Sequence, residues 1–447
     1  MEQDNESQIQ VKLVTQQRKY AVSDSAILVP ANLRRYGLSE IVNHLLGYEK
    51  PIPFDFLIDG EFLRTSLSEY LQNAGLSTEN IVTLEYVESM LPPSSLSAYQ
   101  HDDWVSSVRG HEQGYFLTGS YDNNARIWNP SGECLQTFVG HDAPIKSVAW
   151  VSIQEEDVIC LTASQDRTIR AWHSSISDKQ YDVLYECRGH KGSVESISIN
   201  AQEALFSSGS WDSSIRIWTT TATPNDEDGS DYEFIENAEK RRKIRKKKAT
   251  SIIVKKPISI LTGHVGPVSS VFFDTKDPAK LYSGGWDYSI RTWDIESRTN
   301  VDTKNCDQVV YDIAYSEKSG LIASGHADRA VRLWDSRAED VAVVKLSLVS
   351  HQNWVSAVSW SESSPFMLTS ASYDSCVKIW DIRSKTPLYT LRASDSNSNN
   401  HNRKKESGKK LLCIDWSKDL ILSGGEDNRL HIHGAKKIEG PYTKENL

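Results

Sequence analysis

Alternating apolar and polar positions predict a small folded unit in the first ninety residues. Residues 9–15 alternate as a β-strand, and a second candidate strand, residues 26–29, follows a short turn. The next apolar residues recur at helical spacing, which predicts a helix with Ser39 as its N-cap and Gly47 at its end. The apolar face of this helix comprises Leu38, Ile41, Val42, Leu45 and Leu46.

The rest of this unit predicts a hairpin, a short helix and a last strand. Residues 54–58 and 61–63 flank Asp59-Gly60, a dipeptide typical of two-residue hairpin turns. A helical turn at residues 67–71 precedes a strand at residues 81–87. This order resembles the β-grasp fold of ubiquitin, although no Gly-Gly tail follows. We therefore expect an α+β ubiquitin-like docking domain rather than a conjugated tag.

A different pattern fills the remaining chain: an Asp recurs six residues before an aromatic or imidazole ring. Successive aspartates lie 44, 46, 75, 41, 46 and 53 residues apart, close to the roughly 40–45 residues of a WD-repeat blade. The repeat predicts an all-β, seven-bladed WD propeller after the ubiquitin-like domain. The pairs are Asp122/Trp128, Asp166/Trp172, Asp212/Trp218, Asp287/Trp293, Asp328/Trp334, Asp374/Trp380 and Asp427/His433.

A histidine recurs upstream of most of these aspartates. In each blade the Asp, placed in the turn between the second and third strands, is expected to accept a hydrogen bond from this imidazole, which packs against the Trp. Losing one partner would leave a buried polar group at a cost of roughly 1–3 kcal/mol. A catalytic pair has no reason to recur with the period of a blade, so we interpret these residues as structural. The histidines are His141, His190, His264 and His351, with His101 in the first repeat.

Two repeats depart from the pattern. The fifth lacks a Gly-His dipeptide, and the seventh lacks both the dipeptide and the Trp. Residues 94–99 resemble a strand, and we expect them to form the outer strand of the seventh blade. This closure would pair the two ends of the propeller and leave no free sheet edge.

The uneven distribution of tryptophan along the sequence indicates where one domain ends and the next begins. All 13 Trp lie between Trp104 and Trp416, which puts a boundary near Pro92-Pro93. The expected parts are a disordered N-terminus (1–8), the ubiquitin-like domain (9–89), a linker or closing strand (90–100), the propeller (101–435) and a tail (436–447).

The long third spacing reveals an insertion at about residues 219–257. Residues 226–239 hold seven acidic residues in 14, and eight of the nine residues 240–248 are basic, so we expect a disordered loop. The basic run is either a nuclear localisation signal, a patch for RNA phosphates, or a solvated insertion without function. It comprises Lys240, Arg241, Arg242, Lys243, Arg245, Lys246, Lys247 and Lys248.

Composition and motifs favour a binding protein. The net charge of −10 argues against wholesale coating of nucleic acid, and no run reaches the roughly 18 apolar residues of a membrane span. Six scattered cysteines indicate reduced thiols of an intracellular protein. The chain has no phosphate-binding loop, HExxH motif, paired-cysteine zinc spacing or GxSxG elbow, and His431 with His433 alone makes a weak metal site. We predict a non-enzyme without a cofactor of its own.

Residues 35–47, 53–58 and 103–107 strongly resemble one family, and the likeness extends over nearly the whole chain. That family is the WD-repeat member of the Pescadillo–Bop (PeBoW) complex, which assembles the large (60S) ribosomal subunit in the nucleolus. The resemblance implies a Notchless-type ubiquitin-like domain that docks on the metal-ion-dependent adhesion site (MIDAS) of the AAA+ ATPase midasin. It also implies that the propeller binds the Bop partner's propeller, and that ATP hydrolysis then releases the complex from pre-ribosomes of the nucleolus and nucleoplasm.

The resemblance also singles out one acidic residue. The family's Gly-Leu-Ser-x-Glu loop before the last strand matches residues 75–79, which implies that Glu79 is a metal ligand in trans. A carboxylate there would complete the octahedron of the partner's Mg²⁺. No metal is expected in this chain by itself.

An alternative function comes from two Trp-Asp-x-Arg boxes, which end at Arg337 and Arg383. Consecutive boxes resemble the docking signature of propellers that present substrates to cullin-RING ubiquitin ligases. An Arg after the Trp-Asp turn is also common in any WD repeat, so the boxes leave both interpretations open.

Overall fold

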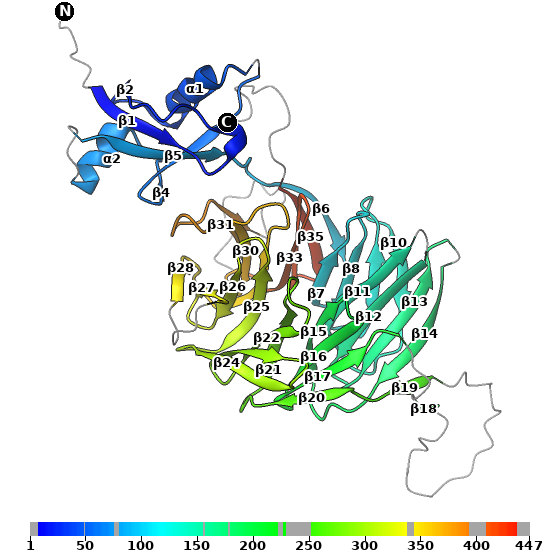
Figure 1. Cartoon of the computed structure of the whole chain (residues 1–447). Helices are drawn as coiled ribbons and strands as arrows, with labels where there is room; N and C mark the ends of the chain where they lie inside the picture. Colours follow the sequence, from blue (N-terminus) through cyan, green and yellow to red (C-terminus); the bar gives the residue numbers. More distant parts are fainter. Residues whose placement is uncertain are drawn as a thin grey trace, which may run out of the picture. The chain divides into compact units, whose positions relative to one another are not determined.

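The computed structural model describes residues 8–48, 50–75, 80–154, 157–177, 179–221, 227–228, 252–337, 344–392 and 408–435. The chain divides into two compact units, one built mainly on residues up to Ser94 and the other mainly on residues from Ser95 onward (Figure 1). No helix among these described residues is both long and apolar enough to cross a membrane.

The first unit is a β-grasp, which confirms the predicted ubiquitin-like fold. Its five-stranded sheet has the order β2-β1-β5-β3-β4, in which only β1 and β5 are parallel. Apolar side chains from the sheet and both α-helices share one core. The elements are β1 (Gln8–Val14), a 3-10 turn (Arg18–Tyr20), β2 (Ile27–Pro30), α1 (Arg35–Leu46), β3 (Phe54–Ile58), β4 (Glu61–Phe62), α2 (Leu67–Ala74) and β5 (Val82–Glu88).

The start of α1 corrects the prediction that Ser39 caps it. The helix begins four residues earlier, at Arg35, and Ser39 lies inside it. The Ser39 hydroxyl instead accepts a hydrogen bond from the backbone N–H of Phe54, 3.0 Å away, and so ties α1 to β3. Leu45, predicted on the apolar face, is 47% exposed. Gly47 ends the helix at a positive φ of 65°, as predicted.

The second unit contains seven four-stranded antiparallel blades, which confirms the predicted all-β propeller architecture. The first three blades are β7 (Val105–Gly110), β8 (Phe116–Ser120), β9 (Ala125–Trp128) and β10 (Cys134–Phe138); β11 (Ile145–Gln154), β12 (Asp157–Ser164), β13 (Ile169–Ser175) and β14 (Gln180–Cys187); and β15 (Val194–Asn200), β16 (Leu205–Ser210), β17 (Ser214–Thr219) and β20 (Ser259–Thr262).

The next three blades follow the same order without interruption. They are β21 (Val268–Phe273), β22 (Lys280–Gly285), β23 (Ser289–Asp294) and β24 (Thr299–Asn305); β25 (Val310–Ser316), β26 (Leu321–His326), β27 (Ala330–Asp335) and β28 (Val344–Val349); and β29 (Val355–Trp360), β30 (Met367–Ser372), β31 (Cys376–Asp381) and β32 (Tyr389–Arg392).

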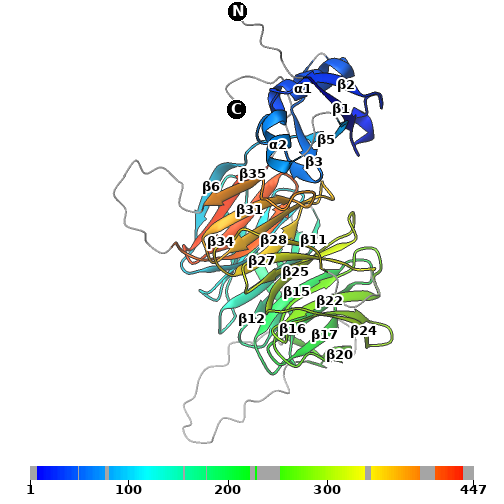
Figure 2. The same ribbon diagram turned by 90° about the vertical axis from the view of Figure 1, so that its left-hand side faces the viewer.

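The seventh blade joins the two ends of the propeller. Its order is β33 (Leu411–Ser417), β34 (Leu420–Gly425), β35 (Arg429–Gly434) and β6 (Ser94–Gln100), so β6 is the outer strand that the sequence predicted (Figure 2). Tyr99 of β6 is buried, stacks on Trp128 with ring centroids 5.4 Å apart, and donates a hydrogen bond to the carbonyl of Pro130. The closing strand therefore packs against the first blade as well as the seventh.

Side chains of the innermost strands connect every pair of neighbouring blades. At each of the seven boundaries, a Ser or Asp oxygen on one inner strand accepts a hydrogen bond from the next blade or the preceding one. The bonds are Val148 N to Ser107, Ile197 N to Ser147, Val271 N to Ser196, Ser270 Oγ to Asp312, Val358 N to Asp312, Trp416 N to Ser359 and Gly110 N to Asp415, at 2.8–3.2 Å.

Part of the insertion is ordered, which corrects the expectation of a loop throughout. β18 (Glu227–Asp228) and β19 (Ile253–Lys255) extend the second blade, where β19 pairs in parallel with β14. Lys255 supplies the physical reason. Its buried ammonium donates to the carbonyls of Thr219 and Thr221 and lies 3.9 Å from the ring centroid of Tyr185. These contacts hold the last residue of β19 against the neighbouring strands.

Removing β6 should destabilise the propeller. A protein that begins at Asp102 lacks both the strand pairing with β35 and the buried Tyr99, and we expect it to lose at least roughly 3 kcal/mol of unfolding free energy. A matched protein that begins at Pro92 lacks the ubiquitin-like domain but retains β6, and it should melt like the propeller of the full chain. Equal melting temperatures for the two shortened proteins would contradict this role of β6.

Candidate partner-binding surfaces

Each of four blades contains the hydrogen-bonded histidine and aspartate that the sequence predicted. In the sixth blade, Nδ1 of His351 lies 2.9 Å from Asp374, and its Nε2 lies 2.7 Å from the hydroxyl of Ser370. The indole N–H of Trp380 donates to the same hydroxyl at 2.8 Å. The other three blades repeat this arrangement with His141 and Asp166, His190 and Asp212, and His264 and Asp287.

The repeat tryptophans of the second, third and fourth blades contact the imidazoles, as predicted. The ring centroids of the pairs with Trp172, Trp218 and Trp293 lie 6.0–6.3 Å apart, and a hydroxyl bridges each pair as well. All three indoles are only 1% exposed, so they belong to the interior of their blades and offer no surface to a partner. Their N–H groups donate as follows: Trp172 to Thr162 at 2.8 Å, Trp218 to Ser208 at 2.9 Å and Trp293 to Ser283 at 2.7 Å.

In each of these blades the hydrogen bonds run from the Trp indole through the hydroxyl and the imidazole to the Asp carboxylate. The indole and the carboxylate at the two ends determine which group donates each bond. An indole N–H can only donate and a carboxylate can only accept, so the hydroxyl must donate to Nε2 and the neutral imidazole must donate from Nδ1. Burial lowers the pKa of His351, which keeps the ring neutral. Burial is the largest influence and opposes ionisation of Asp374, but the hydrogen bonds from His351 and from the backbone N–H groups of Gln352 and Cys376 together outweigh it and lower the pKa of Asp374 to about 2. Each blade thus fixes a charge inside its own turn.

The bridging hydroxyl is the member that the sequence prediction missed. It lies on the second strand of each blade, four residues before the Asp, between the imidazole and the indole. The periodic signal was present, because Ser or Thr occupies this position in every repeat: Thr118, Thr162, Ser208, Ser283, Ser324, Ser370 and Ser423.

In the first blade the repeat Asp is paired with an arginine instead of the histidine. His101 and Trp128 share the hydroxyl of Thr118, but Asp122 binds the guanidinium of Arg126 at 2.6 Å instead of the imidazole. This corrects the expected pairing of His101 with Asp122. Burial lowers the pKa of His101 to about 4, and its ring therefore stays neutral without a carboxylate partner.

In the fifth and seventh blades, histidines at other positions replace the Gly-His histidine or the Trp that these repeats lack. His326, on β26, takes the place of the absent Gly-His in the fifth blade and binds Ser324, the acceptor of the Trp334 indole. In the seventh blade, Asp427 pairs with His431, and His433 stands where the other blades have Trp. His431 is thereby occupied, and within the described part of the chain no group of three His, Cys, Asp or Glu could hold a metal ion.

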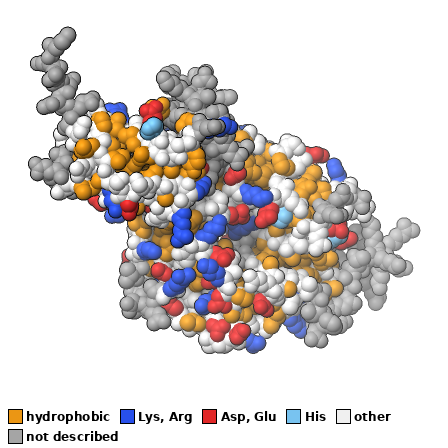
Figure 3. Space-filling model, turned by 45° about the horizontal axis from the view of Figure 1, so that its top comes forward, with side chains coloured by type: hydrophobic (Ala, Val, Ile, Leu, Met, Phe, Trp, Pro, Cys, Tyr) orange, Lys and Arg blue, Asp and Glu red, His pale blue; other side chains and the backbone are white. Residues whose placement is uncertain are grey.

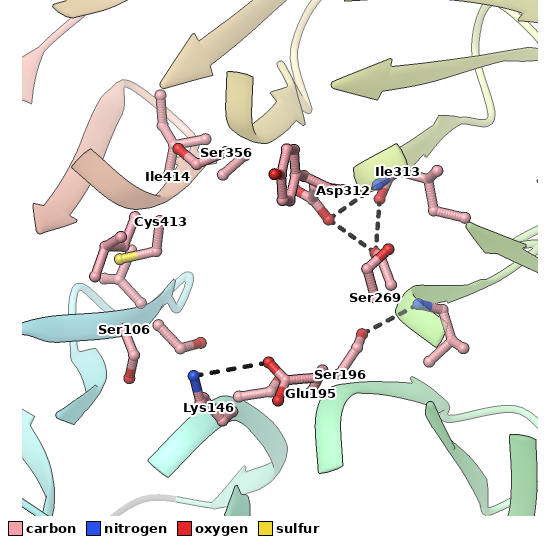
Figure 4. A pocket seen from close by; sticks show the side chains of 18 of the residues that line it. Ser106, Lys146, Glu195, Ser196, Ser269, Asp312, Ile313, Ser356, Cys413 and Ile414 are labelled. Carbon is pink, nitrogen blue, oxygen red and sulfur yellow. Dashed lines mark hydrogen bonds and ion pairs between the residues drawn. The ribbon is translucent and has the colours of Figure 1, made fainter. Parts of the chain in front are cut away.

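One mouth of the central channel is lined by aromatic rings. Beneath them lies a cavity of about 260 Å³ whose lining includes Lys146, Glu195 and the buried Asp312 (Figure 4). Asp312 accepts hydrogen bonds from Ser270 and from the backbone of Ile313 and Val358, so its carboxylate belongs to the joints between blades. The cavity therefore has fixed walls.

The ubiquitin-like domain offers a second surface. Hydrophobic side chains gather on the face of this domain seen in Figure 3, whereas the propeller face in the same view mixes both signs of charge. Glu79 lies outside the described residues, as do the eight basic residues of the run 240–248. The segment that holds Glu79 starts at Gly75, the αL cap of α2, and rejoins the described chain at Asn80, next to the 55% exposed Ile81. The large exposed hydrophobic residues of the domain are Leu28, Tyr36, Leu45, Tyr48 and Ile81.

The two Trp-Asp-x-Arg boxes are bound within their own turns. The side chain of Arg383 donates to Asp381 at 2.9 Å, and the backbone N–H of Arg337 donates to Asp335 at 3.0 Å. Each contact stabilises the turn after the third strand of its blade. These contacts favour a structural role for the boxes.

Comparisons with known proteins find relatives over nearly the whole chain. The NLE (NUC135) domain matches residues 9–71, and the WD domain, G-beta repeat, matches residues 94–129, 132–173, 181–219, 255–294, 299–335 and 343–381. A ribosome biogenesis protein WDR12 homolog of Nematostella vectensis is 40% identical over 431 residues, which cover 95% of this chain and 99% of the relative. The ribosome biogenesis protein YTM1 of Saccharomyces cerevisiae is 34% identical, with 97% and 99% covered.

Replacing the bridging hydroxyl should cost more stability than its size suggests. Ser370→Ala leaves both the Trp380 indole N–H and the His351 Nε2 without a partner, and we expect a loss of roughly 2–4 kcal/mol in denaturant unfolding. Ser370→Thr keeps the hydroxyl in the form that the first two blades use, and should lose much less. If both variants unfolded at the same denaturant concentration, the hydroxyl would not be the stabilising group.

Proposed function

This chain belongs to the family of ribosome biogenesis proteins that includes WDR12 and Ytm1, and on that premise we propose that it is a non-catalytic assembly factor of the large ribosomal subunit. It would act in the nucleolus and nucleoplasm, where it is needed for pre-rRNA processing and subunit maturation. The observation that carries this proposal is the pairing of an NLE-type β-grasp domain with a WD propeller in one chain.

The arrangement of the His–Asp pairs supports a binding role rather than catalysis. A general base must reach a substrate proton, whereas His141, His190, His264 and His351 each have one ring nitrogen on an Asp and the other on a buried hydroxyl. These rings have no nitrogen left for a substrate. The channel walls are likewise occupied by the bonds that join the blades.

We assign the two units to two partners. The propeller would bind the Bop-type WD protein, within the complex that also contains Pescadillo, on the pre-60S particle. The ubiquitin-like domain would dock on the MIDAS of midasin, so that ATP hydrolysis releases the complex. The basic run 240–248 would direct nuclear import or contact rRNA; both roles suit a run of eight Lys and Arg.

Glu79 would supply the metal contact between the ubiquitin-like domain and midasin. Mg²⁺ demands near-ideal octahedral geometry at about 2.0–2.1 Å, so a carboxylate in trans must arrive at one defined position. In the sequence Glu79 lies between α2, which Gly75 caps, and β5, the central strand of the sheet. This chain would hold no metal of its own.

Glu79→Asp should therefore abolish docking although it preserves the charge. Losing one methylene withdraws the carboxylate by roughly 1.5 Å, too far for direct coordination. We expect the affinity for the isolated midasin MIDAS domain with Mg²⁺ to fall more than tenfold in titration calorimetry. Glu61→Asp, an exposed carboxylate of the same domain, is the matched control and should bind normally. Binding that persists in EDTA would refute coordination.

The alternative function, a substrate receptor of a cullin-RING ligase, rests on the Trp-Asp-x-Arg boxes. It predicts that Arg337 and Arg383 contact a ligase adaptor. The side-chain contact of Arg383 with Asp381 accounts for that arginine without such a partner, whereas at Arg337 the bond to Asp335 involves only the backbone N–H.

Purification from nuclear extract separates the two functions. We expect the tagged protein to bring down Pescadillo, the Bop-type protein and large-subunit precursors, and Glu79→Ala to keep these while losing midasin. The double variant Arg337→Ala, Arg383→Ala should purify with the same proteins as the unaltered chain. Recovery of a cullin and its adaptor, lost in the double variant, would instead establish the ligase function.

A further inference from the structure

The exposed tryptophans of the described chain all lie around one opening of the propeller. Eight of the 13 Trp are buried and Trp150 is half-buried, whereas Trp104, Trp211, Trp286 and Trp354 are 39–49% exposed. Trp211 and Trp286 directly precede the repeat Asp of their blades, and Trp104 and Trp354 lie three residues after His101 and His351. The turns that carry the buried hydrogen-bond networks therefore also carry these rings.

The rings contact one another in a continuous arc. Centroids lie 5.3 Å apart for Trp211 and Trp286, 6.1 Å for Trp286 and Tyr311, and 5.5 Å for Tyr311 and Trp354. Tyr373 contacts Trp354 at 5.7 Å, so the arc spans the third to the sixth blade. Trp104 and Tyr121 form a separate pair, at 5.3 Å, on the first blade. We call these seven rings the aromatic mouth.

The charges between the rings already have partners in this chain. Lys146 lies 3.8 Å from Glu195 and 4.7 Å from the ring centroid of Tyr121. Lys410 lies 3.3 Å from Glu426 and 5.2 Å from the ring centroid of Tyr373. Both lysines are therefore paired with a carboxylate, and Asp312 in the cavity beneath is hydrogen-bonded to the inner strands. A charged ligand gains little there, whereas an uncharged one leaves both pairs intact.

The mouth combines three features of a protein-binding hot spot. Trp and Tyr are the residues most enriched in such spots, and the best sites are fixed pockets rimmed by contacts that exclude water. The cavity of about 260 Å³ under the rings has room for several waters, each of which occupies about 30 Å³ in the liquid. A side chain of comparable volume could displace them. The joints between blades hold the walls in place, so little ordering is needed on binding.

We propose that the aromatic mouth is the docking site for a protein loop that inserts an uncharged aromatic or long aliphatic side chain, and that the Bop-type WD partner supplies this loop. The inference rests on the proposed function and names the face of the propeller that would carry it. Self-paired charges favour this occupant over RNA, because Lys146 and Lys410 are each paired with a carboxylate of this chain and are not free to bind phosphates.

The test compares the affinities of full-length variants for the purified Bop-type partner. Trp286→Ala and Trp354→Ala should each weaken binding at least about tenfold, and Trp286→Tyr, which keeps a ring in the arc, should recover most of it. Val301→Ala is the matched control, because Val301 is exposed on the outer strand β24, and its binding should be unchanged. Melting temperatures equal to that of the unaltered chain confirm that each variant is folded.

Three results would overturn the proposal. If the mouth variants bind the partner as tightly as the unaltered chain, the mouth is not the docking face, although the proposed function stands. If the unaltered chain itself does not bind the partner, the proposed function fails together with this assignment. If the variants keep the partner but lose a single-stranded RNA oligonucleotide that the unaltered chain binds, the mouth is an RNA-stacking surface.

Discussion

The buried hydroxyl on the second strand of each blade is the constraint on which the propeller depends. It is the group in the network that can accept from the indole and donate to the imidazole at once. Without it, each of the first six blades would bury a tryptophan N–H and a histidine nitrogen unpaired, at a cost of roughly 1–3 kcal/mol each. The first and fifth blades show how strict this requirement is. They replace the carboxylate partner or move the histidine to another strand, yet they retain the hydroxyl.

A second set of polar contacts turns separate blades into one ring. Each inner strand binds its neighbour through a Ser or Asp oxygen, and the Asp415–Gly110 bond completes the circle between the last blade and the first. The bonds of the buried hydroxyl hold the strands together within a blade, whereas the Ser and Asp bonds of the inner strands hold neighbouring blades together around the channel. The aromatic rings at the mouth therefore stand on strands that are hydrogen-bonded to both neighbouring blades.

The sequence carried most of the architecture because it is periodic. Asp and Trp recur at blade spacing, which predicted seven blades, and the strand-like residues 94–99 predicted the closing strand. Ser370 and its equivalents recur just as regularly, but a single hydroxyl attracts no attention until the indole and imidazole are seen to converge on it. His326 could not be predicted, because it reaches the network from a strand where no other blade has its network histidine.

The surfaces were harder to predict than the interior. The tryptophans of the mouth lie far apart in the sequence, from Trp104 to Trp354, and become one surface only when the blades close. Glu79 stays a prediction from family resemblance alone, since a single carboxylate between two elements has no distinguishing pattern. The closing strand β6 has, in addition, a mechanical consequence. It follows the ubiquitin-like domain after only a few residues and is held in the seventh blade by its pairing with β35. Tension applied along the chain from the N-terminal domain would therefore reach the propeller first at this strand, where the pairing with β35 and the packing of Tyr99 on the first blade both resist it.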